Sequence, residues 1–408
     1  MTNLFSESSF LGTLGRKGLK RHFQKKRIIR LMYLHKALSI QELMINMNLS
    51  SPSVLSLLTE LISEDFVEQI GSGDSSGGRK PKLYGLKPDS FFVLGIDIGL
   101  YSTRISIYNC DNESITEISE FNTKLVDTES TLKEIYKKSQ ELIASSKIKP
   151  HKLIGVGIAM PGLIDLDRGI NYSYLKIEGK SLRAELEKEF SRPVFIINDA
   201  QAKALAELRF GLAQGKKNVL VLNVSSGLGT GLILNGQVYH GTNGFSGEFS
   251  HTPFVENGIL CSCGKKGCLE TVASGLALKR NAIEGLKNGV SSVVLEIVDG
   301  DIDSIQSQHV VKAVKQGDQF SIGLVSKVGY ELGKGISVLV QTLNPELIIV
   351  GGRVSHAGDF LTLPMQQALN EYTLYNIKES VSIAQSQLGD NANLLGLVAY
   401  VMENVLEN

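Results

Sequence analysis

One short stretch of this chain gathers an imidazole and three thiols, which is enough to bind a single ion and to constrain the loop that carries them. The four residues are His251, Cys261, Cys263 and Cys268. One histidine with three cysteines makes a closed, tetrahedral zinc site that leaves no coordination position for water. We therefore expect a structural zinc ion that shapes a loop and performs no chemistry. The alternative is a group of reduced surface thiols beside an unrelated histidine.

A disulfide is a weaker explanation for these cysteines. Cys261 and Cys263 are nearly adjacent, and the chain has one further cysteine, Cys110. The chain begins without an apolar signal segment, and it has no apolar run long enough to cross a membrane. We therefore expect a cytoplasmic protein without a membrane partner, in a compartment where thiols stay reduced.

The first 87 residues differ in charge from the rest of the chain. They hold 13 Lys and Arg against 7 Asp and Glu, whereas the remaining residues hold 29 against 35. A basic end on an acidic body predicts a polyanion as the partner of that end. We expect residues 1–21 to form a basic amino-terminal arm, of which residues 1–15 are a solvated, disordered tail, and residues 22–87 to form a folded module.

Residues 22–87 have the pattern of a winged helix-turn-helix domain, with three short helices between about 22 and 64. The second helix begins at Ser39 with Glu42 three residues later, which is a capping box, and ends near Asn48. The third begins at Ser51, with Pro52 at the first helical position. Its buried stripe is expected to consist of Val54, Leu55, Leu58, Leu61 and Ile62.

A hairpin, or wing, is expected after the third helix, with strands at 66–70 and 82–86 and a tip rich in glycine and serine. The expected DNA contacts lie on the third helix and where the chain leaves the tip: Ser51, Ser53, Ser56, Thr59, Arg79 and Lys80. No Arg or Lys lies between Ser50 and Phe66, although these residues make the usual specific contact to guanine. Direct readout would then rest on hydroxyl groups, with affinity supplied by the basic first helix and the wing. A winged helix can alternatively dock another protein.

From residue 91 the pattern changes to apolar strands alternating with helices. Strands that end in glycine or aspartate are expected within 91–99, 194–200, 218–231 and 345–352, and helices at 128–146, 200–211 and about 320–343. Such alternation predicts α/β layers. Two strand–glycine-turn units favour two lobes of the actin/hexokinase (ribonuclease H-like) kind. The first lobe is expected at 88–200 with about 390–408, and the second, which carries the zinc loop, at 201–389.

The segment around the four metal ligands resembles the zinc motif of the ROK family (repressors, open reading frames and sugar kinases). That motif reads G-E-x-G-H, then C-x-C-G-x-x-G-C-x-E, and this chain matches it except for Ser250 in place of the glycine before the histidine. The segment SGGRKPKLYGL resembles the wing and linker of ROK repressors. The resemblance extends over about residues 10–408, and the branch it is similar to is that of repressors responsive to N-acetylglucosamine, xylose or glucose.

The resemblance implies a sugar site. Asn198-Asp199 matches the N-D of the family, in which the aspartate is the general base toward the sugar 6-hydroxyl. Without phosphates nearby, Asp199 would only accept a hydrogen bond from a hydroxyl. Glu248, His251 and Glu270 would bind the remaining hydroxyls. Such a site discriminates strongly among sugars, because an unmet buried polar group is costly.

The nucleotide side departs from the pattern of ROK kinases. Their first phosphate loop reads D-I-G-G-T-K, and here Leu100 and Tyr101 replace its second glycine and its threonine. A side chain there obstructs the approach of backbone to phosphate. The second phosphate loop aligns with residues 225–231 and is also altered. The residual nucleotide-site positions, among which Asp97 would hold magnesium, are Asp97, Gly99, Gly227, Gly229, Gly351 and Gly352. Alternatively, Gly351 and Gly352 only form the turn that ends a strand.

These features predict a sugar-responsive transcriptional regulator of ROK type, most simply a repressor of carbohydrate metabolism. The winged helix would bind operator DNA as part of a homodimer or a dimer of dimers, and a hexose or amino sugar would bind in the cleft of the body. We expect no enzyme activity. The alternative is an ROK hexose or amino-sugar kinase, dependent on ATP and magnesium, with a DNA-binding appendage. A third possibility makes the body a docking platform for another protein.

Overall fold

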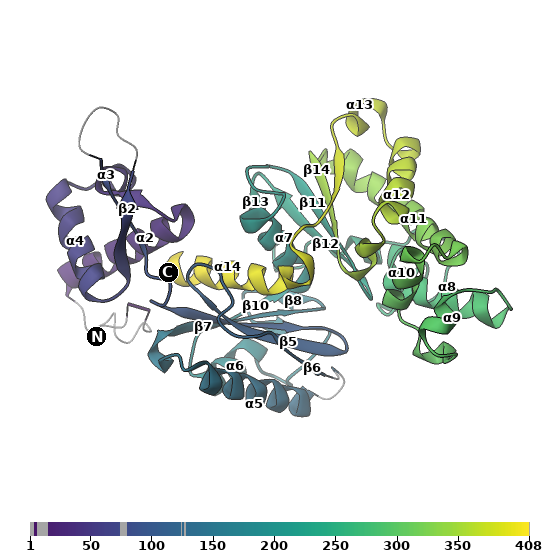
Figure 1. The fold of residues 1–408 in the computed structure, drawn as a ribbon, viewed down its shortest axis with the longest axis horizontal. Helices are drawn as coiled ribbons and strands as arrows, with labels where there is room; N and C mark the ends of the chain where they lie inside the picture. The colour runs from purple at the N-terminus through teal and green to yellow at the C-terminus, as the bar shows by residue number, and fades with distance from the viewer. Residues whose placement is uncertain (1–3, 6–14, 74–79, 124, 126–127, 408) are drawn as a thin grey trace. The chain divides into compact units, whose positions relative to one another are not determined.

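The structure, a computed structural model, describes residues 4–5, 15–73, 80–123, 125 and 128–407 (Figure 1). The chain divides into two compact units. The first unit comprises Met1–Gly162, Arg168–Ile197 and Leu397–Asn408, and the second comprises Leu163–Asp167 and Asn198–Gly396. Each unit contains a five-stranded sheet, and the first also contains a smaller amino-terminal module.

The amino-terminal module, residues 16–86, combines three helices with a three-stranded antiparallel sheet. Its elements are α2 (Arg16–His35), β1 (Leu38–Ser39), α3 (Ile40–Met47), α4 (Ser51–Ser63), β2 (Val67–Ser72) and β3 (Lys82–Leu86). In the sheet, β3 lies between β1 and β2. The expected ends of the second helix are confirmed, because Ser39 and Glu42 form the capping box and Asn48 adopts the left-handed conformation after α3. The return strand of the hairpin also occupies the expected residues.

The first helix begins earlier than expected. It starts at Arg16 rather than near residue 22, so residues 16–21 of the expected basic arm are helical. Contacts with α4 stabilise these additional turns, since Arg21 pairs with Glu60, and Lys25 lies 3.0 Å from the other oxygen of the same carboxylate. The sequence shows a dense run of positive charge here, but the acidic partner lies 39 residues away along the chain.

The buried face of α4 differs from the expected stripe. Leu57 is buried, whereas Leu55 and Ile62 are 43% and 45% exposed. The buried residues Val54, Leu57, Leu58 and Leu61 follow the helical i, i+3, i+4, i+7 spacing. Apolar residues occupy so much of this helix that hydrophobicity alone does not choose between two faces. Glu60, on the same helix, pairs with Arg21 of α2. The N-cap is Ser50, so Pro52 follows Ser51 as the second helical residue.

The first unit's large sheet has the strand order β10-β7-β4-β5-β6. Its strands are β4 (Phe92–Ile98), β5 (Ser102–Asn109), β6 (Ser119–Asn122), β7 (Leu153–Met160) and β10 (Val194–Asn198). Strand β4 pairs antiparallel with β5 and parallel with β7. Helices α5 (Thr128–Ser146) and α6 (Leu182–Phe190) run along one face of this sheet (Figure 1). The unit also contains η1 (Pro150–Lys152) and β9 (Ile170–Asn171).

The second unit's sheet has the order β13-β12-β11-β14-β15. Its strands are β11 (Val219–Val224), β12 (Leu228–Leu234), β13 (Gln237–Val238), β14 (Leu347–Gly351) and β15 (Ser382–Gln385), and β8 (Ile164–Asp165) is a further short strand. The α-helices are α7 (Asp199–Phe210), α8 (Gly275–Lys287), α9 (Val294–Ile297), α10 (Ser307–Lys315), α11 (Gln319–Leu343), α12 (Asp359–Tyr372) and α13 (Tyr375–Lys378). The 3₁₀ helices are η2 (Glu248–His251), η3 (Leu269–Thr271), η4 (Ile302–Ser304), η5 (Arg353–Ala357) and η6 (Gly389–Asn391), and α14 (Ala392–Glu407) begins in this unit.

The two large sheets share one topology. Numbered along the chain within each unit, the strands lie in the order 3-2-1-4-5, with strands 1 and 2 antiparallel and strands 1 and 4 parallel. The expected helices near 128–146, 200–211 and 320–343 are confirmed as α5, α7 and α11. Buried residues of β11, β14 and the helices α8, α10, α11 and α12 form the main core of the second unit. Among the described residues, no helix is both long and apolar enough to cross a bilayer.

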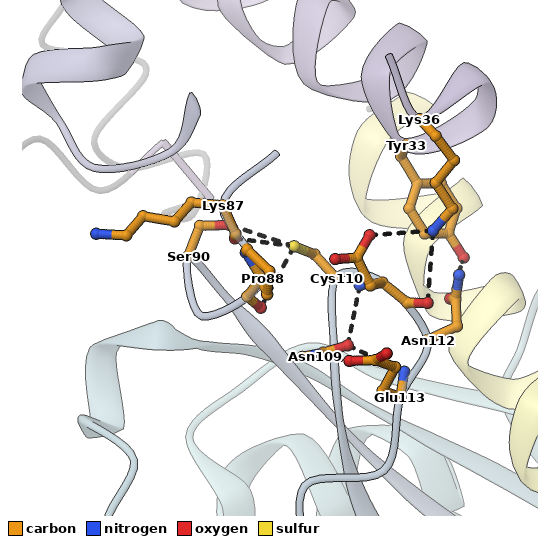
Figure 2. A network of polar contacts seen from close by, with 10 residues as sticks. Tyr33, Lys36, Lys87, Pro88, Ser90, Asn109, Cys110, Asn112 and Glu113 are labelled. Atoms are coloured by element: carbon orange, nitrogen blue, oxygen red, sulfur yellow. Dashed lines mark hydrogen bonds and ion pairs between the residues drawn. The ribbon is translucent and has the colours of Figure 1, made fainter. Parts of the chain in front are cut away.

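A turn in the first unit contacts the amino-terminal module from the end of β5. In this turn, residues 109–113, the side-chain oxygen of Asn109 accepts hydrogen bonds from the backbone N–H groups of Asp111 and Glu113 at 3.0 and 2.9 Å. The adjacent Cys110 Sγ donates to the backbone oxygen of Lys87, 3.1 Å away, in the segment that leads out of the module (Figure 2). Burial raises the pKa of the Cys110 thiol to about 12, so this thiol stays protonated and able to donate.

The tip of the same turn reaches helix α2. Asn112 Oδ1 accepts a hydrogen bond from the Tyr33 hydroxyl at 2.7 Å. Asp111 Oδ1 lies 3.1 Å from Lys36 Nζ, directly after the end of α2 (Figure 2). We call residues 109–113 with their contacts to Tyr33, Lys36 and Lys87 the joint, because this one turn contacts both the first helix of the module and its exit segment.

Candidate functional site

The predicted metal ligands lie together in the second unit. One donor atom from each of His251, Cys261, Cys263 and Cys268 lies within 4.8 Å of the others. Cys261 Sγ is 3.5 Å from His251 Nδ1, and Cys263 Sγ is 3.6 Å from Cys268 Sγ. A tetrahedral zinc ion with Zn–S bonds of about 2.3 Å places its donors roughly 3.6–3.8 Å apart. The donor set and its spacing therefore fit a tetrahedral zinc ion.

The chemistry of the donors agrees with a metal site. Burial, together with the neighbouring Cys263 and Cys261, raises the pKa of the Cys268 thiol to about 12. A cation at the centre favours thiolates, because metal binding displaces thiol protons. The bound ion would hold the chain segment that carries Glu248 and Glu270 in a fixed shape.

The two ring nitrogens of His251 face different groups. Nδ1 lies on the metal side, 3.5 Å from Cys261 Sγ and 4.0 Å from Glu270 Oε1. Nε2 lies 3.8 Å from Glu248 Oε2. If Nδ1 binds the metal, Nε2 is the nitrogen that carries the proton, and it can donate a hydrogen bond to a ligand or to Glu248. His251 can therefore serve both as a metal ligand and as a group that binds a sugar hydroxyl, the two roles predicted from the sequence.

Asn198 and Asp199 lie at the amino-terminal end of α7. Asn198 is the N-cap, and its side-chain oxygen accepts hydrogen bonds from the backbone N–H groups of Ala200 and Gln201 at 2.9 and 3.4 Å. Asp199 is the first helical residue, and its Oδ2 accepts a hydrogen bond from the Asn223 amide at 3.2 Å. Asn198 thus positions the helix end, and the carboxylate that follows it is the group able to accept a ligand hydroxyl.

Three carboxylates approach one another in this unit. Burial raises the pKa of Glu248, and the negative charges of Asp199 and Glu270 raise it further, whereas His251 opposes the shift. Burial also raises the pKa of Asp199. The three groups come from α7, η2 and η3, which are distant in the sequence. Converging acceptors of this kind suit a ligand that carries several hydroxyl groups.

Two glycines permit this arrangement. Gly247 adopts φ +90°, and a Cβ there would lie 2.0 Å from the backbone oxygen of Thr230, so Glu248 reaches its position over a residue that has no side chain. At Gly227 a Cβ would lie 2.7 Å from Glu270 Oε2, which accepts a hydrogen bond from the backbone N–H of Leu228 at 3.1 Å. Gly227, predicted as a residual phosphate position, therefore also leaves room for the Glu270 carboxylate.

The first phosphate-loop segment is a tight hairpin turn in the first unit. The Gly99 N–H donates to the Ser102 backbone oxygen at 2.8 Å, which leaves Leu100 and Tyr101 as the residues of the turn, and Tyr101 is 64% exposed. Asp97, predicted as a magnesium ligand, faces Arg104 across the β4–β5 pair, with Nη1 4.0 Å from Oδ2. A guanidinium at this place competes with a metal cation for the carboxylate.

The other residual nucleotide positions lie in the second unit. Gly229 is in β12 and packs on Ala200 of α7, since a Cβ at Gly229 would lie 2.8 Å from the Ala200 Cβ. Gly351 and Gly352 end β14 and line a cavity of about 10 Å³ together with Lys203 and other residues. A cavity of this size has room for about one water molecule. A close packing contact thus accounts for Gly229, and the cavity beside Gly351 and Gly352 is too small for a nucleotide base.

The residues predicted to contact DNA lie on α4 and beside the hairpin tip. Arg79 is outside the described residues, whereas Lys80 is described and exposed. Ser56 Oγ accepts a hydrogen bond from Arg21 Nη2 at 2.7 Å, and Thr59 Oγ1 donates to the backbone oxygen of Leu55 at 2.8 Å. Ser53 Oγ lies 2.9 Å from Ser50 Oγ, and Ser51 is the first residue of the helix. Several of these hydroxyls therefore already have a partner within the module.

The family model described as the ROK family matches residues 93–404. This chain belongs to the ROK family. The xylose repressor of Caldicellulosiruptor bescii is 30% identical over 396 residues, which cover 96% of this chain and 98% of that protein. A glucokinase of Halalkalibacterium halodurans is 38% identical over 248 residues, 60% of this chain and 74% of that protein.

A solved structure is similar to this ROK protein over most of its length. The structure of a ROK family transcriptional regulator, described as a homologue of the Escherichia coli MLC protein, superposes with a TM-score of 0.77. The match covers 95% of this chain and 100% of that one at 23% identity, so the similarity bears on the fold alone. The mixed five-stranded sheets described above are thus those of a ROK fold.

Two residues near the carboxylates of this ROK protein were missed by the reasoning from sequence. Asn223, the residue before the end of β11, donates a hydrogen bond to Asp199. Lys203 Nζ donates a hydrogen bond to Asn223 Oδ1 at 2.6 Å. A signal for Lys203 exists, because it follows Asp199 by four residues on one helix and so shares its face. Asn223 had no such signal, since its approach to α7 is a contact between distant parts of the chain.

Proposed function

We propose that this protein is a sugar-responsive, DNA-binding transcriptional regulator, and most simply a repressor. The observation that carries the proposal is the convergence of Asp199, Glu248 and Glu270 with His251 beside the metal cluster. This set can bind the hydroxyl groups of a hexose or amino sugar. Similarity to a xylose repressor over almost the whole of both chains supports a regulator with this domain composition.

The amino-terminal module is proposed to be a winged helix-turn-helix domain that binds operator DNA. Helices α3 and α4 and the β2–β3 hairpin supply the two helices and the wing of that motif. On α4, the exposed Leu55 lies among the hydroxyl-bearing residues, and an apolar side chain can contact a thymine methyl group. The exposed Arg16, Lys17 and Lys20 at the start of α2, with Lys80 beside the wing, are available for phosphates.

We propose that the metal at the His251 cluster is zinc and that its role is structural. The set of four protein ligands leaves no position for a reacting water. Binding to operator DNA also implies a cytoplasmic protein, which agrees with the free thiols of the described cysteines. A homodimer, or a dimer of dimers, would present two wings to a site with two-fold symmetry.

The alternative function, an ROK sugar kinase, has one specific observation in its favour. Identity is higher to a glucokinase, 38% over 248 residues, than to the xylose repressor, although a smaller share of this chain is covered. Asp199 at the start of α7 would act as the general base of such a kinase. Against the kinase stand the tight Leu100–Tyr101 turn and the pairing of Asp97 with Arg104.

The decisive experiment combines a sugar screen with DNA binding. The zinc-loaded protein is screened by thermal shift against xylose, glucose, N-acetylglucosamine and N-acetylmannosamine, and operator fragments are selected from genomic DNA. We expect one sugar to raise the unfolding temperature and to change the affinity for a selected two-fold symmetric site. A protein that binds every duplex equally, with or without sugar, contradicts the regulator, whereas ATP-dependent phosphorylation of a sugar supports the kinase.

A further inference from the structure

A lysine and an aspartate on α7 meet at the same amide. Lys203 follows Asp199 by one helical turn, and the two side chains therefore leave the same face of the helix. Asn223 lies between them at the end of β11. Its Oδ1 accepts a hydrogen bond from Lys203 Nζ at 2.6 Å, and its Nδ2 donates to Asp199 Oδ2 at 3.2 Å. The amide thus connects an ammonium group to a carboxylate.

The surroundings of Asn223 favour this one orientation of the amide. The Ser225 hydroxyl also donates to Asn223 Oδ1, at 2.9 Å, so the oxygen receives two donors and the nitrogen is directed toward Asp199. Gly352 allows this packing, because a Cβ at that position would lie 2.7 Å from both Asn223 Oδ1 and Ser225 Oγ. An amide rotated by half a turn would place its N–H₂ group against the ammonium and its oxygen against the carboxylate.

The charges around Asp199 explain why a lysine here matters. Burial raises the pKa of Asp199, and the positive charge of Lys203 lowers it. The Glu248 carboxylate on η2 is a further charged group within electrostatic range of Asp199; it is also within range of Glu270 on η3 and lies 3.8 Å from His251 Nε2. Lys203 is the positive charge that opposes the effect of burial on Asp199.

We propose that Lys203 is a positioning residue which, through Asn223, keeps Asp199 an oriented carboxylate that accepts a hydrogen bond from a sugar hydroxyl. A neutral Asp199 would instead offer a proton to the ligand and lose its bond geometry with Asn223. The sugar in this statement rests on the proposed function. The coupling of Lys203 with Asp199 does not, and it can be measured without any ligand.

The ligand-free test is a double-mutant cycle on the full-length, zinc-loaded protein. Thermal unfolding midpoints are measured for Lys203→Met, Asp199→Asn and the double variant. We expect Lys203→Met to lower the midpoint in the wild-type background and to change it much less in the Asp199→Asn background, where residue 199 no longer carries the charge that Lys203 offsets. Lys203→Arg, which keeps the charge, should recover most of the loss. Equal effects of Lys203→Met in both backgrounds overturn the proposal.

A matched control comes from another lysine of the second unit. Lys216 Nζ lies 3.9 Å from Glu346 Oε2 at a solvent-exposed position. Lys216→Met removes the same charge from the same unit, and exposed pairs contribute little to stability. We expect Lys216→Met to change the unfolding midpoint by the same small amount in the wild-type and Asp199→Asn backgrounds. A coupling of Lys216 to Asp199 as large as that of Lys203 would show that the cycle reports net charge, and it would overturn the specific pairing.

The sugar test follows affinity against pH for the sugar identified in the thermal-shift screen. Without Lys203 the pKa of Asp199 rises, so the carboxylate form is lost at the lower pH values and regained as pH rises. Lys203→Met should therefore bind the sugar more weakly than the wild type at the lower pH values, by up to about tenfold for a shift of about one pKa unit, and should approach wild-type affinity as pH rises. In Asp199→Asn the substitution of Lys203 should not alter the profile.

The outcomes separate the two proposals. If the wild-type protein binds none of the four sugars but the unfolding cycle is non-additive, the sugar function fails and the Lys203–Asp199 coupling stands. If a sugar binds and the Lys203→Met profile superposes on the wild-type profile, the positioning role is overturned while the sugar function stands.

Discussion

At the scale of single residues, Gly247 sets how closely the η2 segment approaches β12. Its φ of +90° lies in the left-handed region, and the space where a Cβ would be is taken by the Thr230 backbone oxygen 2.0 Å away. The next residue, Glu248, is one of the three converging carboxylates. A side chain at position 247 therefore shifts a ligand-facing group as well as straining the backbone.

We predict that Gly247→Ala lowers the free energy of unfolding by about 2 kcal/mol and weakens sugar affinity. The matched control is Gly300→Ala, because Gly300 has a similar φ of +83° with nothing within 4 Å of its Cβ position. That variant should show only the smaller cost of a left-handed alanine, on the order of 1 kcal/mol, with sugar affinity unchanged. Urea unfolding and calorimetric sugar titration measure both effects, and equal effects of the two variants would contradict the explanation.

The metal ligands support a second prediction at this scale. Cys263→Ser removes one of four donors, since a serine hydroxyl is a far weaker zinc ligand than a thiolate. We expect the purified variant to hold much less than the one zinc per chain expected of the wild type and to lose its sugar response. Cys110→Ser, a buried thiol outside the cluster, is the control and should keep the metal. Unchanged sugar affinity after complete removal of zinc would show that sugar binding does not depend on the metal loop.

At the scale of elements, helices α2 and α4 are held together by charge as well as by their apolar faces. The hydrogen bonds of Arg21, with further contributions from Lys25, hold the pKa of Glu60 at about 2. A carboxylate whose folded pKa is depressed contributes stability above its unfolded pKa of about 4.5, and that contribution disappears as pH falls toward 2. The basic first helix is thus partly neutralised within the module.

We predict that Glu60→Gln lowers the urea midpoint of unfolding at pH 7, and that its difference from wild type narrows as pH falls from about 5 to about 3. The side chains of Arg21 and Glu60 are 40% and 36% exposed, so solvent screening keeps the effect modest. The difference in urea midpoint between Arg21→Gln and wild type should narrow over the same pH range, because this substitution removes the other partner of the ion pair. A difference in urea midpoint that stays constant with pH would show that the substitution acts through helix packing and not through the charge of Glu60.

The joint contacts both the first helix and the exit segment of the amino-terminal module, so it is the contact best placed to connect the module with the rest of the first unit. Tyr33→Phe removes the hydroxyl that bonds Asn112 and keeps the ring in its buried place. We expect a loss of about 1 kcal/mol of stability, a smaller change of DNA affinity on adding sugar, and unaltered sugar affinity. Lys138→Met on α5 breaks an exposed pair with Glu141 away from the joint and should leave the response intact. A full sugar response in Tyr33→Phe would exclude this hydrogen bond from the coupling.

At the scale of the whole molecule, the residues that match positions of ROK kinases are divided between the two units. Asp97 and the Leu100–Tyr101 turn belong to the first unit, and Asp199 belongs to the second. The second unit keeps its ligand-facing carboxylates, whereas in the first the Asp97 carboxylate faces Arg104. Leu100 and Tyr101 are altered positions of the first phosphate loop, whereas Asp199, Glu248 and Glu270 match the sugar site that the resemblance implies.

We predict no hexose phosphorylation above background in a coupled assay with ATP and magnesium. Arg104 competes for the carboxylate that magnesium needs, and side chains at positions 100 and 101 obstruct close approach of phosphate to the backbone. The discriminating control is Asp199→Asn, since turnover that this substitution abolishes would belong to the protein and would establish the kinase. Turnover that survives it would indicate a contaminating enzyme.

The sequence by itself determined the features that depend on neighbours along the chain. The capping box at Ser39, the strands that end in glycine and the four metal ligands each need residues of given types at short spacing, and local spacing is readable without a fold. The alternation of strands and helices likewise predicted the α/β layers. The resemblance to ROK proteins, rather than local physics, supplied the roles of Asp199, Glu248 and Glu270.

Only the tertiary structure decided the contacts between segments distant in the sequence. The structure shows that Leu57 of α4 is buried while Leu55 and Ile62 are exposed, and that Glu60 of α4 pairs with Arg21 of α2, 39 residues earlier in the chain. The partner of Asp199 is Asn223, 24 residues further along the chain, and that amide brings Lys203 into the site. Such pairings follow from the packing of whole elements, because the energy of a side-chain contact depends on where the backbones of both residues have already been placed.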